Sequence, residues 1–201
     1  MMRIRNFKEL VCALCVMLAA AYGYRTKDVK NNDNGNEFRL VSNNGSDNGD
    51  ETVSGKVVKV IDGDTYDLLT GDNKTVRVRM NGIDAPEAGM PYAKQATEYL
   101  KELTRNQTIR ISLKDKDRYG RFTSFSYLDD ERELSCEMIK AGYAWHYKQY
   151  NNDKELGKME QEAREARRGL WADNKPMAPW EVRRLKRQGQ STKEILRNNG
   201  N

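Results

Sequence analysis

The stretch VRVRMNGIDAPE at residues 76–87 combines the pattern of a strand with residues that end a strand. Apolar and basic residues alternate through its first five positions, in the order Val76, Arg77, Val78, Arg79 and Met80. A period of two sends the apolar side chains to one face of a strand and both guanidinium groups to the other. We therefore predict a strand with one face in a core and both arginines on a shared surface, ended by an Asn81-Gly82 turn.

Four more strands are predicted around this one. Apolar and β-branched residues predict a strand that starts near Ser54 and ends at the turn Asp62-Gly63-Asp64, and a second strand follows that turn. Alternating apolar residues predict a fourth strand at Ile109–Leu113. After the Tyr119-Gly120 corner, a fifth strand is predicted at Phe122–Leu128.

Three helices complete the predicted domain. Residues 93–103 have helical spacing after Pro91, and two further helical stretches are predicted at 134–141 and 153–168, the last closed by Gly169. A helix inserted after the third of five short strands, with helices at the end, is typical of a small closed barrel. We predict an α+β fold with a five-stranded β-barrel of the oligonucleotide-binding (OB) architecture.

Residues 1–21 have the layout of a cleavable secretory signal peptide. Basic residues precede the apolar stretch Leu10–Ala21, which ends in an A-x-A site at Ala19-Ala20-Ala21. The alternative is a membrane anchor, but crossing a bilayer takes about 20 apolar residues, and polar sequence begins soon after Ala21. We predict cleavage, and therefore a secreted or periplasmic protein with no stable membrane association after the signal is removed.

The cysteines follow from this prediction. Cys12 and Cys15 lie inside the predicted signal, so their C-x-x-C spacing marks neither a metal site nor a redox site. Cys136 is then the only thiol in the mature chain and cannot form an internal disulfide. Within a predicted helix, Cys136 is interpreted as a small buried apolar residue rather than as a nucleophile.

The rest of the chain divides into a tether, one domain and a tail. Residues 22–53 are rich in Asn, Asp, Gly and Ser and predict a flexible tether. With 201 residues, the chain has room for one domain, at 54–172, and we expect a monomer. The tail at 173–201 contains a basic run of Arg183, Arg184, Lys186 and Arg187. This run either helps to hold nucleic acid or forms a solvated helix face.

The net charge is compatible with a polyanionic partner. The whole chain carries +5 at neutral pH. Loss of residues 1–21 would remove Arg3, Arg5, Lys8 and Glu9 and leave about +3. Modest positive charge suits nucleic acid but does not by itself identify it.

Acidic and basic residues at strand ends and turns suggest phosphodiester chemistry. The candidates are Asp62, Asp64, Asp84, Glu87, Arg79 and Arg121. Cleavage of a phosphodiester needs positive charge to stabilise the transition state, a source of hydroxide and a site with little water. Oxygen ligands favour a hard cation, Ca²⁺ or Mg²⁺, because too few thiols and imidazoles are present for a softer metal.

Three motifs in the right order resemble the staphylococcal nuclease (thermonuclease) family. They are VIDGDTY at 60–66, VRMNGIDAPE at 78–87 and DRYGR at 117–121. The resemblance runs from about Gly55 through AGYAW at 141–145 to RGLW at 168–171. It implies a staphylococcal nuclease-like barrel and a Ca²⁺-dependent enzyme that cleaves DNA and RNA, with single strands as the preferred substrate.

The resemblance also implies a role for each candidate residue. Asp64 and Asp84 would bind Ca²⁺ together with the backbone carbonyl of Ala85, and Asp62 would be an outer contact. Glu87 would act on a metal-associated water, either as general base or by orienting it. In that scheme, Arg79 and Arg121 would grip the scissile phosphate, since each presents a planar fork to two oxygens.

Four further residues are predicted to bind the nucleotide. They are Arg118, Tyr119, Tyr147 and Tyr150, of which Arg118 stands where the family often has a lysine. Stacking of a tyrosine ring on a base is the functional interpretation. For Tyr143 and Trp145, packing in the core is an equally good interpretation.

Other classes of protein fit the sequence less well. His146 is the only histidine, which disfavours hydrolases that need two imidazoles. A non-catalytic OB module that binds single strands is the main alternative, but it would have no reason to keep carboxylates that repel phosphate. A calcium-stabilised domain without activity would leave the two arginines without a function. We rank the enzyme first.

Overall fold

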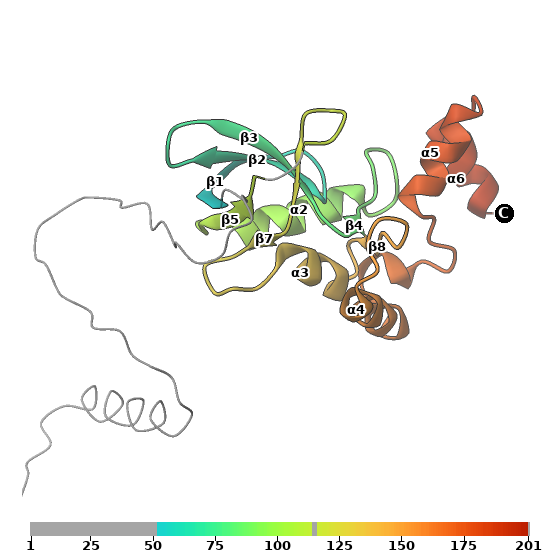
Figure 1. Cartoon of the computed structure of the whole chain (residues 1–201). Helices are drawn as coiled ribbons and strands as arrows, with labels where there is room; N and C mark the ends of the chain where they lie inside the picture. Colours follow the sequence, from blue (N-terminus) through green and yellow to red (C-terminus); the bar gives the residue numbers. More distant parts are fainter. Residues whose placement is uncertain (1–51, 114–115, 201) are drawn as a thin grey trace, which may run out of the picture. The chain divides into compact units, whose positions relative to one another are not determined.

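The computed structural model describes residues 52–113 and 116–200, which belong to one unit of the chain (Figure 1). The predicted signal peptide, residues 1–21, and most of the predicted tether lie outside the described residues. The first strand begins at Thr52, two residues before the predicted start of the domain at Ser54.

A closed barrel is formed by six strand segments. They are β1 (Thr52–Val60), β2 (Thr65–Thr70), β3 (Thr75–Met80), β5 (Ile109–Ser112), β6 (Phe122–Ser124) and β7 (Ser126–Tyr127). Their order in the sheet is β6-β3-β2-β1-β5-β7. The two outermost segments, β6 and β7, are separated in sequence only by Phe125, so one stretch of chain pairs with both ends of the sheet. The predicted fifth strand thus closes the barrel, and the predicted OB-type α+β fold is confirmed.

The core of the barrel is filled by alternate residues of these strands. Fully or almost fully buried side chains include Tyr66, Leu68, Val78, Met80, Ile109 and Ile111. Inside this core the hydroxyl of Tyr66 donates a hydrogen bond of 2.7 Å to Oγ of Ser126, which satisfies its only polar group. The predicted inward face of β3 is therefore correct for Val78 and Met80.

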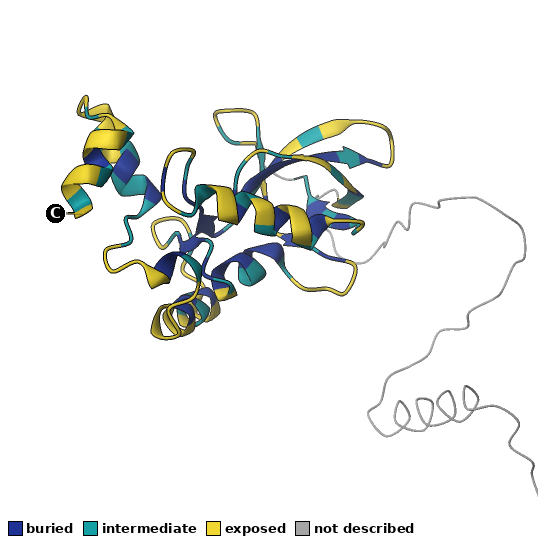
Figure 2. Cartoon of the chain, turned by 180° about the vertical axis from the view of Figure 1, so that it is seen from behind, coloured by how far each residue is buried: buried dark blue, intermediate teal, exposed yellow. Residues whose placement is uncertain are grey.

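Three helices occur near their predicted positions; the first two contact strands of the barrel, and the third packs mainly on the second. They are α2 (Ala93–Thr104), α3 (Leu134–Lys140) and α4 (Lys154–Glu165). Figure 2 shows α2 with one buried and one exposed face, and its buried face carries Ala96 and Leu100 against the barrel core. Cys136 of α3 is half-buried beside that core, and burial raises the pKa of its thiol to about 11. At neutral pH, therefore, Cys136 is a protonated packing residue.

A second, two-stranded sheet was not predicted. It pairs β4 (Ile83–Asp84) with β8 (Trp145–His146) in antiparallel register, with Asp84 opposite Trp145. Each strand has only two residues, too few to show a period. This pairing fixes the backbone of Asp84 against the segment that joins α3 to α4.

The helix α4 ends earlier than predicted. Its last residue is Glu165, and the residue just beyond its C-cap, Arg167, has a left-handed conformation; Gly169 also has a positive φ but lies two residues further on. Gly169 instead begins the 3₁₀ helix η1 (Gly169–Ala172), where a Cβ atom would lie 2.2 Å from the carbonyl oxygen of Gly142. Glycine is required there by the close approach of two backbones.

The predicted C-terminal tail contains two helices, α5 (Pro179–Arg187) and α6 (Thr192–Gly200). Val182 of α5 and Ile195 of α6 are buried in a small cluster with Met90. Pro179 provides a favourable first helical residue. The tail is thus an ordered pair of helices, a difference that arises because its apolar residues pack on a distant loop. No helix within residues 52–113 and 116–200 is long and apolar enough to cross a membrane.

Candidate active site

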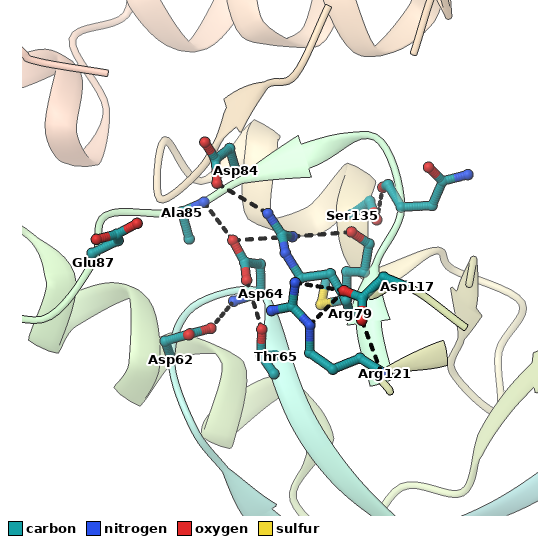
Figure 3. A network of polar contacts seen from close by, with 12 residues as sticks. Asp62, Asp64, Thr65, Arg79, Asp84, Ala85, Glu87, Asp117, Arg121 and Ser135 are labelled. Carbon is teal, nitrogen blue, oxygen red and sulfur yellow. Dashed lines mark hydrogen bonds and ion pairs between the residues drawn. The ribbon is translucent and has the colours of Figure 1, made fainter. Parts of the chain in front are cut away.

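Strand pairing brings Asp64, Arg79 and Asp84 together at one end of the barrel (Figure 3). In the ladder of β2 and β3, Thr65 lies opposite Arg79, so Asp64 immediately precedes that pair. Nη1 of Arg79 is 3.1 Å from Oδ2 of Asp64, and Nη2 is 3.0 Å from Oδ1 of Asp84. One guanidinium group therefore bridges two carboxylates that are almost completely buried.

Hydrogen bonds hold Asp64 in place. Its Oδ2 accepts a hydrogen bond of 2.7 Å from the backbone N–H of Ala85, and its Oδ1 accepts one of 2.9 Å from the hydroxyl of Thr65. Asp62 accepts a hydrogen bond of 3.1 Å from the backbone N–H of Asp64. The four predicted metal-associated residues, Asp62, Asp64, Asp84 and Ala85, are thus neighbours through direct contacts.

Gly63 allows this turn to lie against helix α2. A Cβ atom at Gly63 would lie 2.7 Å from the Cβ atoms of both Ala85 and Ala96. Such a distance is shorter than carbon atoms tolerate, so a larger residue would push the two flanking aspartates out of position. The D-G-D sequence therefore has a packing reason as well as a chemical one.

Burial disfavours the ionised form of two acids in this cluster, Asp62 and Asp84. Burial and the adjacent Asp64 carboxylate raise the pKa of Asp62 to about 7. Burial also raises the pKa of Asp84, although hydrogen bonds from Arg183 oppose the shift. Desolvation and like charge both disfavour ionised carboxylates, so a bound cation would be stabilising here.

Arg121 is positioned by an acid of its own motif. Nε and Nη2 of Arg121 lie 2.8 and 2.7 Å from Oδ2 of Asp117, and Oδ1 of Asp117 accepts the backbone N–H groups of Tyr119 and Arg121. In Figure 3 the guanidinium groups of Arg79 and Arg121 lie on the side of the view opposite Asp62 and Glu87. Asp117 was not predicted as a positioning residue, although its place four residues before Arg121 is a usable signal.

Glu87 lies beyond Ala85 and contacts basic residues from the C-terminal helix α5. Its Oε1 accepts a hydrogen bond of 2.9 Å from Nη1 of Arg183, and its Oε2 is 3.7 Å from Nζ of Lys186. Nη2 of Arg183 also donates a hydrogen bond of 2.7 Å to Oδ2 of Asp84. The sequence placed Arg183 only in a basic run, because nothing local links it to an acid 96 residues earlier.

The predicted nucleotide-binding residues divide into two groups. Arg118 and Tyr119 lie at the corner next to Arg121. Tyr119 is 71% exposed, and the guanidinium groups of Arg118 and Arg121 each lie 5.3 Å from the centre of its ring. Tyr147 and Tyr150 lie after β8 with ring centres 4.8 Å apart. The predicted nucleotide-binding residues therefore lie on two segments, one before β6 and one after β8.

Aromatic packing surrounds Tyr147. Trp180 of α5 stacks on Tyr147 at 5.3 Å with an angle of 4° between the rings. Trp145 is buried and contacts Trp171 edge-on at 4.4 Å, while Tyr143 packs against Tyr99 at 5.1 Å. The packing interpretation of Tyr143 and Trp145 thus agrees with the structure.

The side chains around Asp64 and Asp84 have the oxygen atoms that a hard cation prefers, but they are not arranged as a complete set of ligands. Within residues 52–113 and 116–200, no three acidic, histidine or cysteine side chains converge into a ready-made metal cage. Asp64 and Asp84 nevertheless lie within the span of one guanidinium group and supply only oxygen atoms, the ligands that Ca²⁺ prefers. Arg79 and Arg183 provide the positive charge beside them in this structure.

Comparison with known proteins identifies relatives of this chain. A family model described as "Staphylococcal nuclease homologue" matches residues 77–173. An "uncharacterized endonuclease" of Escherichia coli O157:H7 is 40% identical over 128 residues, which cover 64% of this chain and 83% of that protein. A "micrococcal nuclease" of Shigella flexneri is 37% identical over 140 residues, or 65% of this chain and 80% of that protein. Helices α5 and α6 lie beyond the matched family region.

Proposed function

Because the chain belongs to the staphylococcal nuclease family and is a nuclease that hydrolyses nucleic acid, we propose that it cleaves DNA and RNA with Ca²⁺ as its cofactor. The main structural support for this proposal is the contact of one arginine, Arg79, with two buried acids, Asp64 and Asp84. This arrangement keeps positive and negative groups side by side in a region with little water. Such a region strengthens every charge interaction with a phosphate.

Two carboxylates and a backbone carbonyl are the proposed cation ligands. Asp64 and Asp84 would bind Ca²⁺ directly, with the carbonyl oxygen of Ala85 as a third ligand and Asp62 as an outer contact. When bound, Ca²⁺ supplies a Lewis acid that offsets negative charge on the phosphate and lowers the pKa of its water. Hydrogen bonds from Thr65 and Ala85 orient Asp64 for this role.

The two arginines are proposed to hold the scissile phosphate. Arg79 and Arg121 stay charged at every physiological pH and can each donate two parallel hydrogen bonds to phosphate oxygens. Asp117 holds the Arg121 guanidinium through Nε and Nη2, which leaves the remaining N–H donor positions for substrate. Charge that grows on the phosphate oxygens in the transition state would therefore meet donors already in place.

Glu87 is proposed to accept a proton from the attacking water or to orient that water. It lies on the loop after β4, close in sequence to Asp84 and Ala85, and its side chain is about one third exposed. Carboxylates are weak bases, so orientation of the water contributes alongside proton transfer.

Digestion of end-labelled nucleic acid tests the proposal. We expect cleavage of single-stranded DNA and RNA with Ca²⁺, slower cleavage of duplex DNA, and none with a chelator. Arg79→Ala should abolish most turnover. Arg77→Ala is the matched control, because Arg77 lies on the same face of β3 but pairs with Asp67 outside the cluster. Binding of single strands without cleavage would instead favour the non-catalytic OB module.

Export through the signal peptide at residues 1–21 is the proposed route to the site of action. The motif that supports it is the A-x-A site at Ala19-Ala20-Ala21. The exported protein should begin at Tyr22 by N-terminal sequencing and elute as a monomer in gel filtration. Recovery of the whole chain with Met1 in the membrane fraction would favour the anchor instead.

A further inference from the structure

Helix α5 is anchored beside the candidate active site by a small apolar cluster. Val182 of α5 is buried against Met90, which follows the site loop, and against Ile195 of α6. This cluster is much smaller than the barrel core. Helix α5 is also attached through Trp180, which packs against a second buried cluster that contains Trp145 and Trp171. Both clusters are small beside the barrel core, and few buried apolar contacts mean a low free energy for local opening of α5.

Arg183 of α5 occupies both oxygens of Asp84. Its Nη2 donates to Oδ2 at 2.7 Å and its Nη1 donates to Oδ1 at 3.2 Å, in a fork-to-fork contact. The same Nη1 donates to Glu87 at 2.9 Å. A single guanidinium group thus binds the proposed metal ligand and the residue proposed to act on water.

Trp180 of α5 covers one face of Tyr147, a predicted nucleotide-binding residue. Its ring is parallel to that of Tyr147, with 5.3 Å between the ring centres, and its centre lies 5.5 Å from that of Trp145 in an edge-to-face arrangement. A base that stacks on this face of Tyr147 would need the position that Trp180 fills. The two contacts of α5 lie three residues apart, at Trp180 and Arg183, so they share one face of the helix.

We propose that α5 is an autoinhibitory segment: Arg183 takes the place of the cation at Asp84 and Glu87, and Trp180 takes the place of a base on Tyr147. This inference rests on the proposed function. Ca²⁺ and Arg183 compete for the same carboxylate oxygens, and their like charges repel at short range. Phosphates of the substrate attract Arg183 and Lys186 away from the acids, so substrate and cation open the site together.

The competition predicts how tightly Ca²⁺ binds. A cation that binds only the open form has its apparent affinity reduced by the fraction of molecules that are open. Charge-assisted hydrogen bonds of the kind made by Arg183 correspond to about 10-fold or more in such an equilibrium. Removing the guanidinium group should therefore tighten Ca²⁺ binding by about that factor.

Full-length Arg183→Gln tests the inference, with Arg184→Gln as the matched control. Arg184 is the next residue of the same helix and pairs with Glu181 rather than with the site. Calorimetric titration with Ca²⁺ alone should give a dissociation constant about 10-fold lower for Arg183→Gln than for the wild type, with no change for Arg184→Gln. Equal or weaker Ca²⁺ binding by Arg183→Gln would overturn the inference and make Arg183 part of the working site.

Hydrogen exchange of α5 provides a readout that is independent of catalysis. Ca²⁺ should speed exchange of the amides of residues 181–187 in the wild type, and Arg183→Gln should show fast exchange without Ca²⁺. Unchanged exchange in both cases would mean that α5 stays closed and that the inference is wrong. Ca²⁺-dependent cleavage by the wild type alongside that result would leave the proposed function standing. Absence of both Ca²⁺ binding and cleavage in every variant would end both proposals.

Discussion

The residues of the site come from two kinds of backbone. Asp64, Arg79 and Asp84 lie at the ends of strands, are at most 14% exposed, and contact one another. Glu87 and Arg121 lie on loops, with side chains 32% and 26% exposed, and contact residues outside that cluster. Strand-borne groups are therefore buried and contact one another, with Arg183 as an additional partner of Asp84, while loop-borne groups are more exposed and have partners outside that cluster.

This difference in burial separates the contribution of the site residues to stability from their contribution to function. A buried carboxylate that loses its cationic partner is left desolvated, so the strand-borne groups contribute to folding as well as to cation binding. Exposed pairs contribute little to stability because water already solvates both charges. Substitutions at the strand-borne positions should then affect stability and function, whereas those at Glu87 and Arg121 should affect function with little change in stability.

The largest effect is expected at a loop position. Glu87→Gln should reduce turnover by roughly 10²-fold or more, because a positioned proton acceptor is lost. The free energy of unfolding should change by less than about 0.5 kcal/mol, as for other surface substitutions. Cleavage rates with Ca²⁺ measure turnover, and urea unfolding in the presence of chelator measures the free energy of unfolding. Glu98→Gln, an exposed change on α2 beside Lys101, is the control; wild-type turnover in Glu87→Gln would remove Glu87 from the mechanism.

The two arginines sharpen the comparison directly. Arg79→Lys and Arg121→Lys should each lose about 10- to 100-fold in turnover, because the charge remains and the planar fork is lost. Only Arg79→Lys should also lose about 2 kcal/mol of stability, since its guanidinium bridges two buried acids. Equal unfolding free energies of the two variants would contradict the distinction between strand and loop positions.

Two aspartates, Asp64 just before β2 and Asp67 within β2, form a matched pair that tests cation binding. Asp64→Ala should weaken Ca²⁺ binding by about tenfold or more, because one anionic ligand is lost. Asp67→Ala should leave the affinity unchanged, since Asp67 pairs with Arg77 at 2.7 Å on the same two strands but outside the cluster. Calorimetry on both variants decides the matter, and a normal affinity in Asp64→Ala would show that the metal site has been misplaced.

The smallest effect is expected at the acid that holds Arg121. Burial raises the pKa of Asp117, but hydrogen bonds from Arg121 and from two backbone N–H groups outweigh it, and the pKa is below the ordinary value. A lowered pKa in the folded state stabilises the protein above the pKa of the unfolded state and ceases to do so as the pH falls through the folded value. Asp117→Asn should cost about 1 kcal/mol at neutral pH.

That cost should shrink towards zero in acid, where Asp117 is protonated in the wild type as well. Thermal unfolding of both proteins as a function of pH provides the measurement. A difference that is the same at every pH would mean that Asp117 acts through its shape and not through its charge.

Sequence alone determined the barrel and predicted most of the residues that lie at the candidate site. The alternation in residues 76–80 identified the buried face of β3, and the order of three motifs identified the family. Asp62, Asp64, Asp84 and Glu87 were expected at strand ends and turns, where the structure has them. These features are local, because a period or a motif is written in consecutive residues.

Only the tertiary structure decided which residues meet across the chain. The pairing of β4 with β8 joins segments that are too short to show a period, and Arg183 reaches Asp84 across 99 residues. No neighbouring residue signals such a contact, since it depends on the path of the whole chain and on the packing of Val182 against Met90. The sequence shows that the run at 183–187 is basic, which is compatible with a solvated helix face or with a nucleic-acid contact. It does not show which acids pair with these residues, because the fold decides that Arg183 contacts Asp84 and Glu87.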